Sequence, residues 1–198
     1  MHNKNIGFTI GKFAPLHKGH QLVIETALKE MDEVYVVIYD TDIIKINIEK
    51  RAAWIKKLYP SIHLVYAYNS PTQYGLDEQS VNIQMKYLNG LINDIPVTHF
   101  YSSELYGEKV ANYLNIENRV VDIQKNIVPI CATSIRKDYN YNKEFLEDFI
   151  YEDMKKMCQR GRAFLTTKGA SKRHYDHFSE EDFVKLLNPI IKGITIIN

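Results

Sequence analysis

The sequence predicts an α/β fold in which a parallel sheet of about five strands is flanked by helices. Short runs of β-branched and aromatic residues alternate along the chain with segments whose apolar residues recur at helical spacing. The run at 33–39 is almost continuously apolar, which is typical of a strand buried inside a parallel sheet. The chain has 198 residues, 45% of them hydrophobic and 25% charged, and is long enough to bury a sizeable core.

Strands and helices are predicted in alternation from the N-terminus. A strand, a helix and a second strand are complete by residue 39, and the crossover between such parallel strands should be right-handed. Pro60 ends the second helix, because the residue before a proline is driven out of the helical conformation. The expected strands are residues 5–10, 33–39, 62–68, 97–101 and 119–123. The expected helices are residues 21–29, 48–59, 81–92, 107–114, a short one beginning near 133, and 145–158.

The turn between the first strand and the first helix has the composition of an anion-binding site. Such a turn directs free backbone N–H groups and the positive end of a helix dipole to one point. His17 and His20 can face the same anion, and Lys12 adds a positive charge. Gly19, which has no side chain, lets a ligand approach the backbone closely. The turn therefore predicts a phosphate site, in the sequence Gly11-Lys12-Phe13-Ala14-Pro15-Leu16-His17-Lys18-Gly19-His20.

A second group of phosphate-binding residue types follows the last expected strand, in the segment Ile130-Cys131-Ala132-Thr133-Ser134-Ile135-Arg136. The hydroxyl of Thr133 or Ser134 could cap a short helix there and donate to phosphate. Arg136 is close enough in sequence to bring a planar guanidinium to the same anion. Taken alone the segment is typical of an ordinary helix start, and its meaning comes from its pairing with the histidine turn.

The histidine turn fits the pattern G-x-F-x-P-x-H-x-G-H and resembles the signature of the HIGH-type nucleotidylyltransferases, which have a Rossmann-like fold. The second segment is similar to the I-S-x-T-x-x-R motif of the same superfamily, with Cys131 in place of the usual serine. Over about residues 5–150 the chain most resembles the NadR-type nicotinamide mononucleotide adenylyltransferase domain. Further matches are the helix around Trp54, Ser102-Ser103-Glu104-x-Tyr106-Gly107, Val128-Pro129-Ile130 and Arg136-Lys137-Asp138.

Two departures from the NadR-type family are visible. Bifunctional members continue into a ribosylnicotinamide kinase domain, whereas this sequence has no G-x-x-x-x-G-K-[ST] motif, so kinase activity is not implied. The family also supplies tryptophans near the nicotinamide ring, and Trp54 is the only tryptophan here. Tyr74 or Tyr106 could replace them, because an aromatic face attracts a cationic ring. On the helix at 48–59, Trp54, Ile55 and Leu58 fall on one face and should belong to the core, whereas Arg51 should point elsewhere. Arg51 is a further candidate contact to the acceptor, since the related enzymes often carry a substrate-binding arginine on this helix.

The resemblance implies transfer of AMP from ATP to nicotinamide mononucleotide, which gives NAD and pyrophosphate. The acceptor phosphate would attack the α-phosphorus in line, without a covalent enzyme intermediate, so the protein positions reactants and stabilises charge. His20 would contact the α-phosphate, and Mg²⁺ would bridge phosphate oxygens. The rest of the triphosphate would be held by His17, Lys12, Arg136, Thr133 and Ser134, and by backbone N–H groups near Gly11, Phe13 and Gly19.

Two other functions fit the same residues. The first keeps the chemistry and changes the substrates, as in a cytidylyltransferase or a pantetheine-phosphate adenylyltransferase. The second is a non-catalytic nucleotide-sensing module whose basic tail contacts a partner, although a sensor has no need of the histidine pair. Asp40 and Asp42 follow the second strand and could bind a metal ion, while capping of the next turn is the simpler interpretation.

Charge and composition argue against several other classes of function. A net charge of +1 gives no electrostatic basis for binding nucleic acid or a membrane. Two cysteines are too few for a disulfide framework or a cysteine-based zinc site. A signal peptide and an apolar run long enough to span a bilayer are both missing, so a cytoplasmic location is expected.

The chain is expected to divide into a nucleotidylyltransferase domain at residues 1–150 and a C-terminal extension at residues 151–198. The apolar residues of the helix at 145–158 fall on one side, so this helix should pack on the core. A basic loop is expected at 159–162 and 166–174, followed by a capped helix from Ser179. The sequence leaves a homo-oligomer open.

Overall fold

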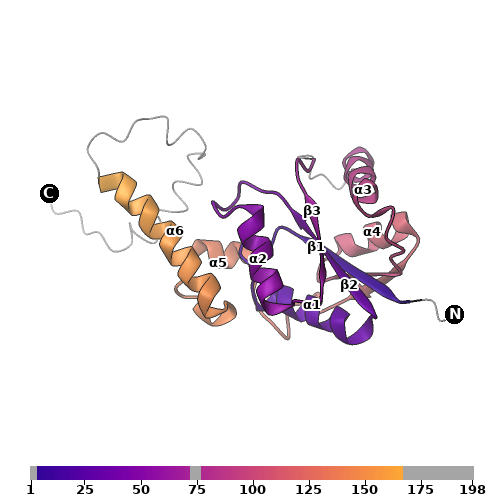
Figure 1. Cartoon of the computed structure of the whole chain (residues 1–198), viewed down its shortest axis with the longest axis horizontal. Coiled ribbons are helices and arrows are strands. Elements are labelled where there is room, and N and C mark those ends of the chain that lie inside the picture. The colour runs from indigo at the N-terminus through magenta and orange to yellow at the C-terminus, as the bar shows by residue number, and fades with distance from the viewer. Residues whose placement is uncertain (1–3, 72–76, 167–198) are drawn as a thin grey trace.

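The computed structural model describes residues 4–71 and 77–166, with only the backbone described for residues 158–166. Its centre is a five-stranded sheet in the order β3-β2-β1-β4-β5, in which every adjacent pair is parallel (Figure 1). The strands are β1 (Ile6–Gly11), β2 (Glu33–Tyr39), β3 (His63–Ala67), β4 (His99–Ser102) and β5 (Glu117–Val120). The helices are α1 (Lys18–Glu30), α2 (Ile48–Leu58), α3 (Glu78–Ile92), α4 (Tyr106–Leu114), α5 (Ala132–Lys137) and α6 (Asp148–Thr166), with a 3₁₀ turn at Lys143–Phe145.

Helices cover both faces of the sheet. On one face, α1, α2 and α6 bury apolar side chains against β2 and the loops around it, among them Ile24, Trp54 and Ile150. On the other face, α3 and α4 do the same through residues such as Leu88 and Val110, which pack with Phe8 and Phe100. The two helical layers are visible on opposite sides of the strands in Figure 1. This is the predicted fold, a parallel sheet flanked by helices.

The strand order places a switch point beside β1. From β1 the chain moves in one direction to β2 and β3, and then crosses back to place β4 on the other side of β1. Residues 6–11 of β1 pair in register with residues 33–38 of β2, while Gly7 and Phe8 pair with His99 and Phe100 of β4. In open α/β sheets, ligands bind outside the carboxyl ends of the strands where the order reverses. That position lies beyond Gly11 and Ser102, next to the histidine turn.

The expected docking of the C-terminal helix on the core is confirmed for residues 148–157. Ile150 and Met154 are buried, and the indole N–H of Trp54 on α2 donates to Asp153 on α6 at 2.8 Å. Lys50 on α2 also forms an ion pair with Asp153 at 2.8 Å. The expected loop at 159–162 is wrong, because these residues continue α6 to Thr166 in spite of Gly161. The basic loop from residue 167 and the helix from Ser179 lie outside the described residues.

The fifth strand begins and ends earlier than predicted. Residues 119–123 were expected to be extended, but β5 spans Glu117–Val120. Asp122 adopts a positive φ of 49°, which a strand residue cannot have. Its carboxylate accepts hydrogen bonds from the backbone N–H groups of Ile127 and Val128 at 3.0 and 2.9 Å, so the chain turns there. Local side-chain capping thus outweighs the strand propensity of the apolar residues.

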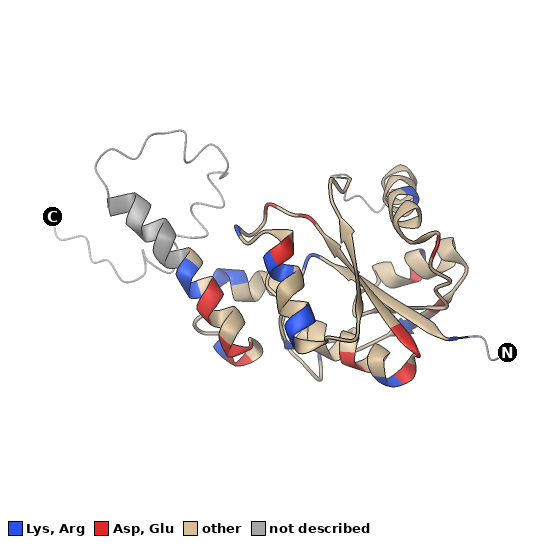
Figure 2. Ribbon diagram, in the orientation of Figure 1, with Lys and Arg blue, Asp and Glu red and all other residues tan. Residues whose placement is uncertain are grey.

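Charged residues are distributed without a dominant sign. Figure 2 marks both acidic and basic residues along α2 and the described part of α6, whereas few residues of the strands are charged. This distribution agrees with the net charge of +1. None of the helices within 4–71 and 77–166 is long and apolar enough to span a membrane.

Candidate active site

The histidine turn runs from the end of β1 to the start of α1. His17 is the N-cap of α1, and its Nδ1 accepts the backbone N–H of Gly19 at 3.1 Å. This bond satisfies one of the free N–H groups at the helix start and fixes the imidazole over the backbone. A Cβ at position 19 would lie 3.0–3.1 Å from the His17 ring, so a side chain there would crowd the imidazole. The group that approaches Gly19 closely is therefore the imidazole of His17.

The two histidine rings are stacked. Their centroids are 3.8 Å apart with an interplanar angle of 28°, and Phe13 meets His20 edge-on at 4.9 Å. Phe13 is buried and has a positive φ of 48°, and a Cβ on Gly11 would meet its ring at 3.2–3.5 Å. The turn is thus closed by aromatic contacts rather than by charge. Of the residues expected in it, His17, Phe13, Gly19, Gly11 and His20 are brought together.

Both histidines are neutral in the free protein. Burial lowers the pKa of His17 to about 4, with smaller contributions from the charges of Lys125 and Arg136. Burial also holds the pKa of His20 well below its usual range, with contributions from His17, Lys125 and Arg136. Because Nδ1 of His17 accepts a hydrogen bond, its neutral ring carries the proton on Nε2. His17 can therefore donate one N–H to an oxyanion without bringing a charge.

We expect the burial of His17 to make the protein acid-sensitive. Its folded pKa of about 4 lies below the ordinary value of 6.5, so the unfolded chain binds a proton that the folded chain does not. The free energy of unfolding should therefore have its full value above pH 6.5. It should fall by about 3 kcal/mol as pH decreases towards about 4. His17→Asn keeps an acceptor for the helix start and removes this titration. Urea unfolding at about pH 7 and about pH 4.5 should show a smaller acid loss for the variant; an equal loss in both proteins contradicts the assignment.

Arg136 joins the second segment to the histidine turn. Its guanidinium donates from Nη1 to the carbonyl of Ala14 at 2.6 Å and from Nη2 to Oγ1 of Thr133 at 3.0 Å. The first bond connects α5 to the turn across more than a hundred residues of chain. The charge of Arg136 also lowers the pKa of both histidines, which places it near the two rings. The two predicted phosphate segments therefore meet at one place.

The cap of α5 differs from the prediction. The N-cap is Cys131, with extended backbone and no side-chain capping bond, while Thr133 and Ser134 lie inside the first turn. The expectation that one of these two hydroxyls caps the helix is wrong, because the chain already turns helical at Ala132. Cys131 Sγ and Ser134 Oγ are 3.2 Å apart, and this contact lowers the pKa of the thiol. Both hydroxyls remain at the helix start, where they could face an anion.

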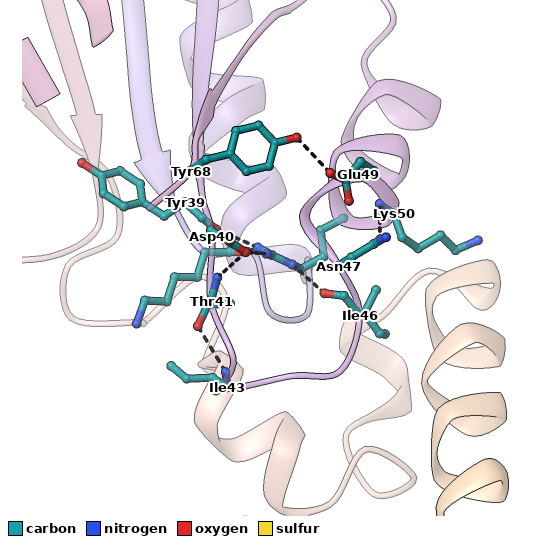
Figure 3. A network of polar contacts seen from close by, with 11 residues as sticks. Tyr39, Asp40, Thr41, Ile43, Ile46, Asn47, Glu49, Lys50 and Tyr68 are labelled. Carbon is teal, nitrogen blue, oxygen red and sulfur yellow. Dashed lines mark hydrogen bonds and ion pairs between the residues drawn. The ribbon is translucent and has the colours of Figure 1, made fainter. Parts of the chain in front are cut away.

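Arg51 has a different role from the one the sequence suggested. It was expected to point away from the core face of α2 and to contact the acceptor, but its side chain is completely buried. The guanidinium donates to the main-chain carbonyls of Lys12, of Tyr39 at 3.0 Å and of Ile46 at 3.0 Å. Figure 3 shows Tyr39 and Ile46 in this network. Arg51 thus ties the histidine turn, the end of β2 and the following loop together.

Asp40 lies beside this network. One of its carboxylate oxygens accepts the N–H of Thr41 at 2.8 Å and lies 3.8 Å from Nη2 of Arg51 (Figure 3). The turn that follows is capped by Thr41 rather than by Asp40, because Oγ1 of Thr41 accepts the N–H of Ile43 at 3.2 Å. Within the described residues, no three histidine, cysteine or acidic side chains are arranged to hold a metal ion.

Of the two predicted acceptor tyrosines, Tyr74 and Tyr106, the structure describes only Tyr106. Tyr74 lies outside the described residues. Tyr106 is the first residue of α4 and packs, half-buried, against the core on the α3 and α4 face, which raises the pKa of its hydroxyl. Tyr66 in β3 and Tyr68 just after it present exposed rings that stack on each other at 5.8 Å. In the sequence this pair could have been found from two tyrosines that lie two residues apart near the end of a strand.

Lys125 is a charged residue that sequence reasoning missed. It lies in the loop between β5 and α5, and its charge lowers the pKa of His17 and His20. Nothing in the local sequence marks it, because its approach to the histidines depends on how this loop crosses the sheet edge.

Several proteins are similar to this chain in sequence or in fold. The chain is 26% identical over 153 residues to the trifunctional NAD biosynthesis/regulator protein NadR of Salmonella typhimurium, covering 68% of this chain. It spans only 37% of the length of that relative. A solved structure of NadR bound to NAD and AMP-PNP matches 72% of this chain and 44% of that one, with 23% identity and a TM-score of 0.53.

A second solved structure extends the match. The bifunctional NMN adenylyltransferase/ADP ribose pyrophosphatase of Francisella tularensis, complexed with AMP and a manganese ion, covers 99% of this chain. The chain covers 58% of that protein, with 16% identity and a TM-score of 0.56. At such identities the solved structures establish the fold alone. The predicted resemblance to a NadR-like nucleotidyltransferase domain is confirmed by the sequence match to NadR. The family model of the citrate lyase ligase C-terminal domain matches residues 7–157, more than half of the chain, and the protein therefore belongs to that family.

Proposed function

We propose that this protein transfers AMP from ATP to nicotinamide mononucleotide and releases NAD and pyrophosphate. The observation that carries the proposal is the stacked, neutral histidine pair at the switch point of the sheet, with the cations Arg136 and Lys125 beside it. The two cations offset the negative charge of a triphosphate, and the neutral N–H groups donate hydrogen bonds to it without transferring a proton. The name of the NadR relative, a NAD biosynthesis protein, supports the choice of reaction.

The chemistry requires one displacement at phosphorus. An oxygen of the acceptor 5′-phosphate attacks the α-phosphorus of ATP, and the bond from the α-phosphorus to the oxygen that bridges it to the β-phosphate breaks. Pyrophosphate leaves with the electron pair of that bond, and no proton has to be moved. The protein therefore aligns the two phosphates and stabilises charge as it shifts towards the leaving group.

The residues divide this work according to their position. His20 contacts the α-phosphate, and its Nδ1 is buried without a hydrogen-bond partner in the described structure. His17 donates from Nε2 to the β- and γ-phosphates, where Lys12 and the helix start add positive potential. Arg136 stabilises the leaving pyrophosphate, oriented by its bonds to Ala14 and Thr133. Mg²⁺ bound together with ATP would supply further charge stabilisation, without a carboxylate or histidine cluster of the described residues to hold it.

The acceptor is proposed to bind on the β2 and β3 side of the switch point. Tyr66 and Tyr68 offer exposed aromatic faces there, and Asp40 contributes a half-exposed carboxylate. An aromatic face and a carboxylate both attract a pyridinium ring, which is the cationic part of nicotinamide mononucleotide. This pair of tyrosines takes the place that the sequence assigned to Tyr106.

Product analysis tests the proposed reaction. Purified protein with Mg²⁺, ATP and nicotinamide mononucleotide should form NAD and pyrophosphate in equal amounts, as measured by chromatography of the nucleotides and a pyrophosphate assay. Tyr66→Ala with Tyr68→Ala should raise the KM for the acceptor about fivefold to tenfold, because loss of a cation–π contact of about 1 kcal/mol has that effect. The KM for ATP should stay within about twofold of the wild-type value.

The matched control and the contradicting results are specific. Tyr113→Ala removes an equally exposed tyrosine from α4 on the other side of the sheet and should leave both KM values unchanged. An unchanged acceptor KM in the double tyrosine variant would move the ring site elsewhere. Turnover with CTP or with phosphopantetheine, and none with nicotinamide mononucleotide at millimolar concentration, would replace the proposed acceptor. Binding of ATP without turnover of any acceptor would instead favour a nucleotide sensor.

A further inference from the structure

The loop between β5 and α5 crosses the sheet edge from β4 to the histidine turn. It begins at Val121, whose N–H donates to the carbonyl of Ser102 at the end of β4 at 2.8 Å. It ends at Ile130, whose carbonyl oxygen lies 3.7 Å from the place where a Cβ on Gly19 would be. The side chains in the middle of this loop are therefore held between the end of β4 and the start of α1.

The middle of the loop is a fixed structure. Asp122 and Lys125 both have positive φ, 49° and 56°, and the N–H of Lys125 donates to the carbonyl of Asp122 at 2.9 Å. Each such residue costs roughly 1 kcal/mol or more relative to ordinary backbone, so other contacts must hold the turn. The Asp122 carboxylate supplies them by accepting the N–H groups of Ile127 and Val128. The conformation of Lys125 is thus set by its loop.

The side chain of Lys125 is held as well. Its Nζ donates to Oγ of Ser103 at 2.8 Å and lies 3.3 Å from the carbonyl oxygen of the same residue, in the loop that follows β4. These contacts use two of the three ammonium donors. In the described part of the chain no carboxylate forms an ion pair with it within 4.0 Å, and Asp122 is the acidic group that feels its charge.

The charge of Lys125 reaches both histidines. It contributes to lowering the pKa of His17 and of His20, in each case together with Arg136. Two cations are therefore placed near the two imidazoles at the start of α1. A polyanion is the ligand that such an arrangement attracts.

We propose that Lys125 binds the β- and γ-phosphate end of the bound nucleoside triphosphate, with Ser103 as the residue that positions its ammonium group. The inference rests on the proposed function only for the triphosphate, and it is independent of the acceptor. Lys125 and Arg136 then approach the triphosphate from separate segments, the β5–α5 loop and α5. The leaving pyrophosphate is neutralised from two directions.

Binding of inorganic tripolyphosphate tests the proposal without any acceptor. Isothermal titration calorimetry should show that Lys125→Met weakens binding by about tenfold to a hundredfold, the effect of losing one charge-assisted hydrogen bond. Lys125→Arg should bind within about threefold of the wild type, because it keeps the charge. Lys29→Met removes one exposed lysine from the far end of α1 and serves as the control for net charge. It should leave binding unchanged.

Two further measurements separate a phosphate contact from a merely structural lysine. In Lys125→Met without ligand, the pKa of His17 followed by NMR should rise, because a neighbouring positive charge has been removed. In the wild-type protein, tripolyphosphate should protect Lys125 from chemical acetylation and leave Lys29 reactive, as read by mass spectrometry. The second experiment needs no variant and holds even if Lys125→Met does not fold.

The outcomes are distinguishable. Unchanged tripolyphosphate affinity in folded Lys125→Met, or equal acetylation of Lys125 with and without tripolyphosphate, overturns the assignment. Absence of NAD formation together with Lys125-dependent binding of tripolyphosphate overturns the proposed reaction alone. NAD formation with binding that does not depend on Lys125 overturns the present inference alone.

Discussion

His20→Ala should lower kcat by about a hundredfold or more and change the KM for ATP only modestly. Loss of one donor to charge that develops in the transition state costs about this much in other enzymes. His20 is neutral in the free protein because burial and the neighbouring cations hold its pKa well below the usual range. In the proposed mechanism its contact with an α-phosphate oxygen strengthens as charge is redistributed in the transition state, which affects the rate more than ground-state binding.

The effect on kcat must be separated from damage to the turn. His20 stacks on His17 and meets Phe13 edge-on, so its removal also loses aromatic contacts. Circular dichroism and thermal unfolding should show that the variant is still folded. His63→Ala is a suitable control, because His63 begins β3 at the opposite edge of the sheet and is half-exposed. Near-normal turnover in folded His20→Ala would remove His20 from the proposed mechanism.

Arg51→Met should lower the free energy of unfolding by about 3–5 kcal/mol, which is the usual cost of removing a buried charged group from its partners. Methionine replaces much of the volume and leaves the carbonyls of Lys12, Tyr39 and Ile46 without their donor. A buried acceptor left unsatisfied costs about 1–3 kcal/mol, so the three losses outweigh any gain from removing the charge. For a chain of this size the midpoint of thermal unfolding should fall by about 10 °C.

Urea unfolding measures this effect against a neighbouring substitution. Lys50→Met removes an adjacent lysine of α2 whose pair with Asp153 is partly exposed, and should cost less than about 1 kcal/mol. Arg51→Lys can reach fewer carbonyls than the guanidinium does and should fall between the wild type and Arg51→Met. A loss below about 1 kcal/mol in Arg51→Met would show that the three segments are held by other contacts.

Elements with local causes were predicted well. The run at 33–39 forms β2 over the same residues, and Trp54 and Ile55 are buried on the predicted face of α2. The histidine turn was also predictable, because its geometry follows from a strand end, an N-cap and Gly19 within ten residues of one another. Where a local competitor was overlooked, the prediction was wrong. The capping carboxylate of Asp122 ended β5 early, and α6 continued through Gly161.

Arg51 shows how a correct rule can be applied incompletely. Its spacing from Trp54, Ile55 and Leu58 is three, four and seven residues, which places it on the same helical face as they are. The prediction placed Arg51 away from this face, since charged residues are rarely buried without partners. The partners exist, but they are carbonyl groups supplied by segments far away in sequence. Helical periodicity indicates which way the Arg51 side chain points. The carbonyl groups that accept its hydrogen bonds come from segments that only the fold brings together.

The sequence by itself determined the order of strands and helices and the histidine turn. These depend on propensities and backbone geometry within one or two turns of chain. Only the tertiary structure decided that Arg136 donates to Ala14, that Lys125 lies near both histidines and that these imidazoles are uncharged. Such properties arise from burial and from charges on separate segments, and both exist only once the sheet has brought those segments together.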